Sequence, residues 1–541
     1  MRKGTYILVA AVLLVSLVLA ACAQPAPSPA PATPTATPKT ATPTVTPKAS
    51  PTQPAAATPR YGGMLRIAFG TMPRSFLPPL YPGGTMVYPA ATHDSLLRLD
   101  DKGELAPWLA TSWKVDQSAK TLTLTLRKGV KFHDGTDFTA AAVKWNIEKR
   151  RDSKQGDYEE VTSISIIDDY TLVLNLSKFT NTLFVTLWNL GGYMASQTAF
   201  QKMGEDWAHW NPVGTGPFKF VNYVTDSLYK LERFDGYWQK GKPYLDKLDI
   251  HLIADKVITQ LALEKGEVDA FTQPTGEQGY DLQKKGFQIL QPHMPDTVYG
   301  FIADSANPDS VFANKKVREA VEYAIDREAI VKAVGYGFYE PSYQITPTYQ
   351  YPYNPEVKGR PYNPAKAKQL LAEAGYPNGF KTSIYGRSTS IAGRQETVAA
   401  VTNLKEVGID ATLVPLTITA FAQRTQEGWK NSMLYQIFWS EPDWVWRQYA
   451  NFSTTSVAHK SMLKPSGLQD LLEKASATPD FQTQKTLSQQ IVKMVSDEAI
   501  VAPLWAFNFP VMYVKQLQNP GGLRNTRPTI SQGPADFWLN K

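Results

Sequence analysis

The sequence predicts an α/β protein of more than one domain. A strand periodicity, a helix periodicity and the length of the chain support this prediction. Leucine and threonine alternate over residues 121–126, which is the two-residue period of a strand with one buried face. The body of the chain, residues 60–541, is too long for one hydrophobic core and should divide into two or three domains. A helix with one buried face is expected where apolar residues recur three and four positions apart, at Val317, Ala320, Val321, Ala324 and Ile325.

Residues 1–21 have the composition of a signal peptide. Arg2 and Lys3 precede an almost unbroken apolar run over residues 6–21. This run is shorter than the roughly 18 to 20 residues of a spanning helix, so we expect cleavage. Cys22 is the only cysteine, and the stretch that ends at it, Leu-Ala-Ala-Cys, resembles a bacterial lipobox, in which the cysteine is acylated. A buried or reactive cysteine is the less favoured alternative. We expect an exported lipoprotein, anchored through Cys22 to the cell membrane and facing the periplasm or the cell exterior.

Residues 22–59 are rich in proline, threonine and alanine and contain no aromatic residue. Such a segment cannot bury enough apolar surface to fold, and its prolines favour an extended chain. We therefore expect a disordered tether. At about 3.1 Å per residue it could hold the body on the order of 100 Å from a membrane. An O-glycosylated stalk is the alternative.

The elements of the body follow from local signals. We expect a first strand over residues 63–69 and then a loop over residues 70–84 that is rich in proline and glycine. After the strand at residues 121–126, Asp134-Gly135 predicts a turn, and Thr139 is expected to cap a helix with Val143 and Ile147 on its buried face. The alternation returns over residues 171–176, which predicts another strand.

A hairpin is expected over residues 214–238. Gly214, Gly216 and Pro217 predict a tight turn, and strands are expected over residues 218–221 and 229–234. Tyr229 and Leu231 share the apolar face of the second strand.

Three helix starts are predicted further along, at Asn314, Asp326 and Asn363-Pro364. The second of these helices should end near Gly335 and the third at Gly375. Arg318, Asp326 and Arg327 are accordingly expected to be structural.

Charge gives little support for a nucleic-acid partner. The chain has 56 basic and 49 acidic side chains, but the first 59 residues hold four of the basic ones and no acid, which leaves 52 against 49 in the body. The body also has no basic run interleaved with aromatic residues.

The sequence offers little for catalysis. The zinc-protease H-E-x-x-H, the hydrolase G-x-S-x-G and the two glycine-rich nucleotide motifs are all absent, and one cysteine cannot build a thiolate metal site. The six histidines are scattered, and His133 with Asp134 fits a turn better than a catalytic pair. We expect no enzyme, no cofactor and no protein metal site. A secreted glycosidase is the alternative from another class, and it would need two carboxylates, such as Glu441 and Asp443, about 5 to 10 Å apart across a cleft.

A series of short motifs in fixed order resembles the signature of family 5 solute-binding proteins, the dipeptide-, oligopeptide- and nickel-binding components of ABC importers. The resemblance runs from Gly63 to about Asn519. Its motifs are PWLA at 107–110 with Trp113, LRKGVKFHDG at 126–135, VKW at 143–145, GTGPF at 214–218, YW at 237–238, GEVD at 266–269, VREA at 317–320, AIDREAI at 324–330 and YNPAKA at 362–367.

The resemblance implies a two-lobe fold like that of periplasmic binding proteins, of the class with an extra domain, in which helices flank mixed sheets and a ligand cleft lies at a hinge. The central lobe would comprise residues 61–99, 211–299 and 505–541. The extra domain, residues 100–210, would pack on it, and the second lobe would be residues 300–504. The solute would be buried by hinge closure.

The implied function is to capture a peptide or similar small solute and to deliver it to permease subunits served by a cytoplasmic ATPase. The protein is expected to be a monomer. An oligosaccharide or a metal chelate is the alternative solute, and a tethered peptide sensor or chaperone is an alternative role for the same fold.

In the family, the loop after the first strand, the hinge crossings and an acidic segment of the far lobe line the pocket. Aromatic rings suit this task because they supply apolar area with few rotors, although each ring here could equally belong to a core. The candidate ligand-binding residues are Tyr81, Gly83, Gly84, Phe271, Thr272, Tyr299, Phe301, Trp439, Glu441, Asp443, Trp444, Trp505 and Phe507.

One position departs from the family's peptide binders. They carry an aspartate, just before a Glu/Asp-Pro step, that pairs with the α-amino group of the peptide, and Phe438 occupies this place here. Glu441 or Asp443 could take over the role. Four clustered tryptophans would equally suit sugar stacking, namely Trp429, Trp439, Trp444 and Trp446.

Overall fold

The computed structural model describes residues 58–541 except 72, 74, 81–85, 101–102, 155–156, 291–296, 392–393, 440–443, 457, 508–509, 524–531 and 541. Residues 58–541 form one compact unit. The predicted leader, the lipidation site at Cys22 and nearly all of the tether lie outside the described residues. None of the helices described has both the length and the apolar character needed to cross a membrane.

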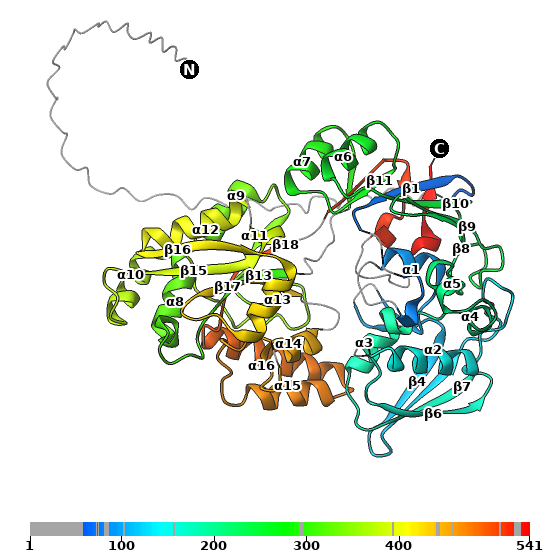
Figure 1. Cartoon of the computed structure of the whole chain (residues 1–541), viewed down its shortest axis with the longest axis horizontal. Coiled ribbons are helices and arrows are strands. Elements are labelled where there is room, and N and C mark those ends of the chain that lie inside the picture. Colours follow the sequence, from blue (N-terminus) through cyan, green and yellow to red (C-terminus); the bar gives the residue numbers. More distant parts are fainter. Residues whose placement is uncertain are drawn as a thin grey trace, which may run out of the picture. The chain divides into compact units, whose positions relative to one another are not determined.

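A seven-stranded mixed sheet occupies one part of this unit (Figure 1). β1 at its centre runs parallel to β10 and β11, and the other pairs are antiparallel. Helices α6 (Lys256–Glu264) and α7 (Gly276–Lys284) follow β10 and β11 along the chain. The strands, in sheet order, are β12 (Gln288–Leu290), β19 (Val511–Tyr513), β11 (Ala270–Thr272), β1 (Met64–Phe69), β10 (Lys247–Leu252), β9 (Leu228–Arg233) and β8 (Phe218–Val224).

The predicted hairpin is confirmed as the antiparallel pair of β8 and β9, with Tyr229 and Leu231 buried. The turn before it requires glycine because the backbone passes very close to a neighbouring segment. A Cβ on Gly214 would lie 2.2 Å from the carbonyl oxygen of Thr92, and one on Gly216 would lie 2.5 Å from the backbone nitrogen of His93. No side chain fits in so small a space.

His133 holds this turn in place. Its Nε2 donates to the carbonyl oxygen of Gly216 at 2.9 Å, and its Nδ1 accepts from the backbone N–H of Gly214 at 3.3 Å. Burial lowers the pKa of His133 to about 4, so the ring is neutral at pH 7. Gly135 follows in the left-handed region with φ of 85°, which confirms the predicted Asp134-Gly135 turn.

A four-stranded antiparallel sheet is built from residues 110–176, and its strands in sheet order are β4 (Ala110–Asp116), β5 (Thr121–Leu126), β7 (Thr171–Leu176) and β6 (Val161–Asp168). The three leucines of β5 are buried, as the alternation predicts. Helix α2 (Ala140–Asp152) packs Val143 and Ile147 into the same core. Thr139 is the N-cap residue of α2, as predicted, but its side chain makes no capping hydrogen bond.

Short elements connect these two sheets along the chain. They are α1 (Val87–Thr92), α3 (Thr182–Trp188), α4 (Gln197–Met203), α5 (Glu205–Trp210) and the paired strands β2 (Leu97–Leu99) and β3 (Leu105–Pro107). A further pair, β20 (Leu517–Gln518) and β21 (Trp538–Leu539), follows β19 near the end of the chain.

A six-stranded mixed sheet forms the third part, and its strands in sheet order are β14 (Tyr339–Pro341), β18 (Val501–Phe507), β13 (Thr297–Ala303), β17 (Met433–Trp439), β15 (Phe380–Arg387) and β16 (Ile409–Leu416). Nine helices accompany it in the described residues (Figure 1). They are α8 (Lys315–Ala324), α9 (Arg327–Val334), α10 (Pro364–Glu373), α11 (Ser388–Ile391), α12 (Gln395–Glu406), α13 (Ile418–Glu427), α14 (Trp444–Phe452), α15 (Leu468–Ala477) and α16 (Phe481–Asp497).

The predicted helix starts are confirmed. The side chains of Asn314, Asp326 and Asn363 each accept a hydrogen bond from a backbone N–H in the first turn of the following helix. Arg318 and Arg327 are buried and donate to backbone carbonyls, as a structural role requires.

The chain passes from the seven-stranded to the six-stranded sheet between Leu290 and Thr297, and it returns between Phe507 and Val511. Residues 297–299 and 505–507 therefore belong to the six-stranded sheet, whereas the expected division places them with the central lobe. The reason is the length of β13 and β18, which pair with each other from Thr297 to Ile302.

A second connection joins the four-stranded sheet region to the C-terminal end of α15. Asn181 Nδ2 donates to the carbonyl oxygen of Ala475 at 2.5 Å. The backbone N–H of Asn181 donates to the carbonyl oxygen of Ser476 at 2.8 Å. Gln117 Nε2 donates to the carbonyl oxygen of Ala477 at 2.9 Å. These donors satisfy carbonyls that the end of a helix leaves unpaired.

Replacing Asn181 with alanine should lower the free energy of unfolding by about 1 to 3 kcal/mol, because the buried carbonyl of Ala475 loses its donor. Urea denaturation followed by tryptophan fluorescence measures this loss. Asn222→Ala, at an exposed position of β8, is the control and should change stability by less than about 0.5 kcal/mol. Equal midpoints for the two variants would show that the Asn181 contact contributes nothing.

Candidate functional site

Aromatic side chains gather where β13, β17 and β18 lie side by side. Tyr299 of β13 is paired with Trp505 of β18 in the sheet register. The ring of Tyr299 stacks on that of Tyr435 of β17, with centroids 5.4 Å apart. Phe507, two residues beyond Trp505 on β18, meets the ring of Tyr339 edge to face at 4.7 Å. The structure therefore brings four of the predicted ligand-binding residues into one group, and all four are almost wholly buried in the core of the six-stranded part, namely Tyr299, Phe301, Trp505 and Phe507.

Arg394, directly before α12, lies beside this aromatic group. Burial lowers its pKa, but the charges of Tyr339 and Glu396, with smaller contributions from Tyr299 and Tyr435, outweigh burial and raise it. Its Nε is 3.5 Å from Glu396 Oε1 and makes no hydrogen bond in the described part of the chain. Glu396 Oε1 instead accepts from the hydroxyl of Tyr339 at 3.3 Å. The guanidinium thus keeps hydrogen-bonding capacity.

Lys256 is the first residue of α6, which follows β10 of the seven-stranded sheet. Burial lowers its pKa, and the positive charge of Arg394 lowers it further. Gln278 of α7 donates to the carbonyl oxygen of Lys256 at 2.8 Å, and the rings of Tyr280 and Tyr336 are 5.8 Å apart. Helix α7, which Gln278 joins to the start of α6, therefore lies against the segment that leads into β14 of the six-stranded sheet.

The other predicted ligand-binding residues are not gathered here. Phe271 packs in a small core beneath α6 and α7, and Thr272 donates to the carbonyl oxygen of Ala68 at 3.0 Å. Trp444 is buried in a second core of the six-stranded part. Trp439 ends β17, but its side chain is outside the description. Also outside are Tyr81, Gly83, Gly84, Glu441 and Asp443.

The tryptophans considered for sugar stacking do not share a surface. Trp429 and Trp444 are fully buried, whereas Trp446 on α14 is 47% exposed. Nor do the described residues bring three His, Cys, Asp or Glu side chains together as a metal site would.

Sequence reasoning did not find Arg394, Glu396, Tyr339, Tyr435 or Lys256. The first two are close in the sequence, but the stretch around them has no recognisable motif, and the others come from separate elements. The register of β13, β17 and β18 could have identified Tyr435, which lies beside Tyr299 only after the strands pair.

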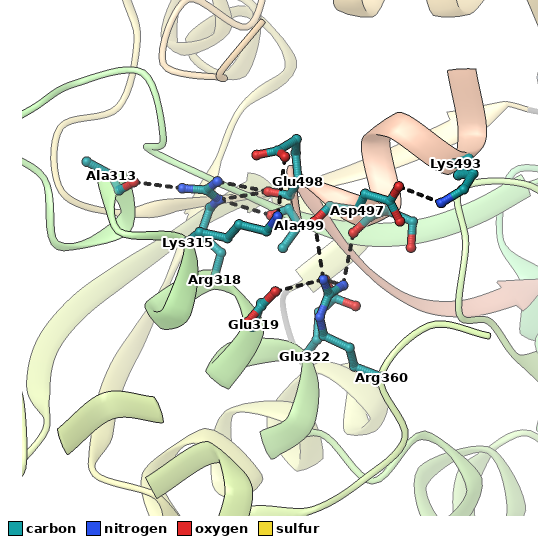
Figure 2. A network of polar contacts seen from close by, with 11 residues as sticks. Ala313, Lys315, Arg318, Glu319, Glu322, Arg360, Lys493, Asp497, Glu498 and Ala499 are labelled. Carbon is teal, nitrogen blue, oxygen red and sulfur yellow. Dashed lines mark hydrogen bonds and ion pairs between the residues drawn. The ribbon is translucent and has the colours of Figure 1, made fainter. Parts of the chain in front are cut away.

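A pocket of about 430 Å³ lies elsewhere, between α8, α10 and α16. Arg360 lines it and donates to the carboxylates of Glu319 and Glu322, each at 3.0 Å, and to the carbonyl oxygen of Ser496 at 3.0 Å (Figure 2). Arg318, in the same view, donates to the carbonyls of Ala313 and Glu498. Because these side chains and carbonyls form hydrogen bonds with one another, the network joins α8 to the end of α16.

Comparison with known proteins agrees with the motifs. The model of the middle region of bacterial extracellular solute-binding proteins, family 5, matches residues 104–458. The glutathione-binding protein GsiB of Escherichia coli strain K12 is 32% identical over 365 residues, which are 65% of this chain and 70% of that protein.

Solved structures share the fold of this chain. The periplasmic binding protein DppA of Helicobacter pylori, in complex with the peptide STSA, is 25% identical with a TM-score of 0.71, covering 89% of this chain and 99% of that one. The substrate-binding protein CtaP of Listeria monocytogenes has a TM-score of 0.76 at 22% identity, covering 89% and 100%.

Proposed function

Because the chain belongs to the bacterial extracellular solute-binding proteins of family 5, we propose that it is the substrate-binding component of an ABC importer, which captures a peptide or peptide-like solute for a membrane permease. The observation that carries the choice of a peptide is the likeness to H. pylori DppA, a peptide complex that matches this chain over 89% of its length. The glutathione-binding relative points to the same class of solute, since glutathione is itself a peptide.

The solute would lie between the seven-stranded and six-stranded sheets, at the group formed by Tyr299, Trp505 and Phe507 with Arg394. Two crossings of the chain join the sheets, which is the connection that hinge closure needs. The rings are almost wholly buried in the core of the six-stranded part, so they would support the site from beneath. In this proposal Phe271, Phe301 and Trp444 support the site from the cores, and Tyr81, Gly83, Gly84, Glu441 and Asp443 remain candidates to line it.

The domain division extends this proposal. Residues 61–99, 211–296 and 508–541 would form the central lobe, residues 100–210 the extra domain, and residues 297–507 the second lobe. The permease subunits, with their cytoplasmic ATPase, would recognise the closed form. Export by the leader, acylation at Cys22 and the tether of residues 22–59 would place a monomeric protein at the outer side of the cell membrane.

Native mass spectrometry of the full chain, before and after mild denaturation, tests this function. We expect a bound mass that is released on unfolding and fragments as a peptide. A released sugar or metal chelate would replace the peptide while keeping the binding role. If no mass is released, and panels of peptides, sugars and chelates leave the melting temperature unchanged, the importer role fails. A glycosidase or a chaperone would then be the better account.

A further inference from the structure

The end of α15 is bound from the four-stranded sheet region at four successive carbonyl groups, those of residues 475–478 (Figure 1). Asn181 Nδ2 donates to the first and the last of these carbonyl oxygens, at 2.5 and 3.4 Å. The backbone N–H of Asn181 donates to the second at 2.8 Å, and Gln117 Nε2 donates to the third at 2.9 Å. All four carbonyls at the end of this helix therefore have a donor in another part of the molecule.

The two helix ends that meet here are complementary. The C-cap residue of α15, Thr478, is extended, unlike the left-handed glycine with which many helices bind their own last carbonyls. Asn181 is the N-cap residue of α3, a position that favours asparagine, yet its side chain makes no capping hydrogen bond to α3. Its amide serves α15 instead. The positive end of the α3 dipole also faces the negative end of the α15 dipole, which is an attractive arrangement.

This contact joins two bodies that have separate cores. Leu468 and Leu472 of α15 are buried in a core with Val298 of β13, so α15 belongs with the six-stranded sheet. The four-stranded sheet region is fixed instead to the seven-stranded sheet, because His133 holds the turn at Gly216 that leads into β8. The contact at α15 thus ties the two larger sheets together by a route that is independent of the two chain crossings.

A contact of a different kind lies beside one of the crossings, at α7. A Cβ on Gly279 would lie 3.0 Å from Cζ of Phe338 and 3.6 Å from Cγ of Pro510, which directly precedes β19. A Cβ on Gly276 would lie 3.3 Å from Cδ2 of Tyr336. Rings that lie on glycine make van der Waals contact, which tolerates small rotations. Hydrogen bonds weaken steeply with distance and angle, so a relative rotation of the two bodies breaks the bonds at α15.

We propose that the contact of Asn181 and Gln117 with the carbonyls of residues 475–478 is a latch, which must break before the two larger sheets separate and which therefore controls how fast a bound solute leaves. The inference rests on the proposed function and extends it from capture to release. Neither side chain belongs to the aromatic group at the candidate site, so the latch acts on every solute by the same factor. Because opening returns these groups to water, each hydrogen bond changes the release rate only a few-fold.

The first measurement is a distance across the latch, and it needs no solute. Cys22→Ser removes the only cysteine, and Lys114→Cys on β4 with Lys474→Cys on α15 provides exposed positions for two spin labels. Double electron–electron resonance then records the distance distribution between the labels. Adding Asn181→Ala should move part of this distribution to longer distances, because the two bodies separate more often when the latch is weakened.

Asn175 on β7 provides the matched control. Its Nδ2 also donates twice, to the hydroxyls of Ser163 and Ser165 at 3.1 and 3.2 Å, but both partners lie in the same four-stranded sheet. Asn175→Ala therefore removes as many side-chain hydrogen bonds as Asn181→Ala does, and none of them joins the two bodies. The distance distribution should remain that of the parent protein.

The second measurement is the rate of release. Stopped-flow tryptophan fluorescence follows the release of glutathione, of the dipeptide Met-Leu and of the solute that co-purifies with the chain. Asn181→Ala should raise each release rate by the same factor, about threefold to tenfold, and Gln117→Ala, at an exposed side chain, by about twofold. Asn181→Asp should release fastest, because it has no donor and its charge faces the negative end of α15. Asn175→Ala should release as the wild type does.

The latch and the importer role fail in distinguishable ways. If Asn181→Ala and Asn175→Ala give the same distance distribution or the same release rates, the latch is wrong and the importer role stands. Faster release of one solute but not of the others leads to the same conclusion, since it indicates direct contact with that solute. If the wild type neither retains a solute nor binds any that is offered, the proposed function fails, and the latch with it. Circular dichroism spectra that match the wild type establish that the variants are folded.

Discussion

Replacing Asp94 with alanine should lower the free energy of unfolding by about 3 to 5 kcal/mol, because four donors converge on this fully buried carboxylate. Trp108 Nε1 and Trp238 Nε1 donate to it at 2.7 and 2.9 Å, and the Tyr237 hydroxyl at 3.4 Å. The guanidinium of Arg98, almost wholly buried, lies 3.1 Å away and stacks on Trp108. Truncation leaves two indole N–H groups and a buried cation facing a methyl group.

Urea denaturation followed by tryptophan fluorescence is the measurement, since two of the donors are themselves tryptophans. Asp309→Ala, at an exposed position, is the matched control and should change stability by less than about 0.5 kcal/mol. An Asp94→Ala protein that unfolds at the same urea concentration as this control would contradict the role assigned to the carboxylate.

Replacing Arg360 with methionine should destabilise the fold by about 3 to 5 kcal/mol at pH 8, because Glu322 then loses the cation that faces it (Figure 2). Burial raises the pKa of Glu322 from its ordinary 4.5 to about 7, although Arg360 opposes the rise. Without Arg360 the pKa of Glu322 should rise further. The loss should therefore be smaller at pH 5, where Glu322 binds a proton and is no longer a buried charge.

The sign of the wild-type dependence follows from the same carboxyl group. Between pH 4.5 and about 7 the folded protein binds a proton at Glu322 that the unfolded chain releases. The contribution of Glu322 to stability therefore falls as the pH rises through this window. The urea midpoint of the wild type, measured from pH 4.5 to 8, should show this fall. In Glu322→Gln the part of the pH dependence that comes from Glu322 should be absent.

Lys493→Met is the control for Arg360, since its ion pair with Asp497 belongs to the same region but is half exposed. Such a pair contributes less than about 1 kcal/mol. If Arg360→Met and Lys493→Met have the same midpoint at pH 8, or if Glu322→Gln keeps the full pH dependence, the assigned electrostatics are wrong.

Much of the fold could be predicted from the sequence because its signals are local. The alternation in β5, the hairpin of β8 and β9 and the caps at Asn314, Asp326 and Asn363 each depend on a few neighbouring residues. The motifs also indicated the family correctly.

The site could be predicted only in part. Tyr299, Trp505 and Phe507 share a group because strands far apart in the sequence pair in one sheet, whereas Trp444 packs in a separate core. The sequence did not indicate the role of Asp94 either, because a buried carboxylate is recognised by its donors, and Trp108 and Trp238 are far apart in the sequence.

The most direct test of the central claim, that a solute is captured between the two sheets, is a distance between spin labels on each side. Cys22 is the only cysteine, so Cys22→Ser allows labels at exposed positions 230 on β9 and 368 on α10. Double electron–electron resonance would record the distance distribution between the two labels with and without a peptide that binds. We expect the peptide to shift the distribution to a different, narrower one. An unchanged distribution at saturating peptide would contradict capture by closure of the two sheets.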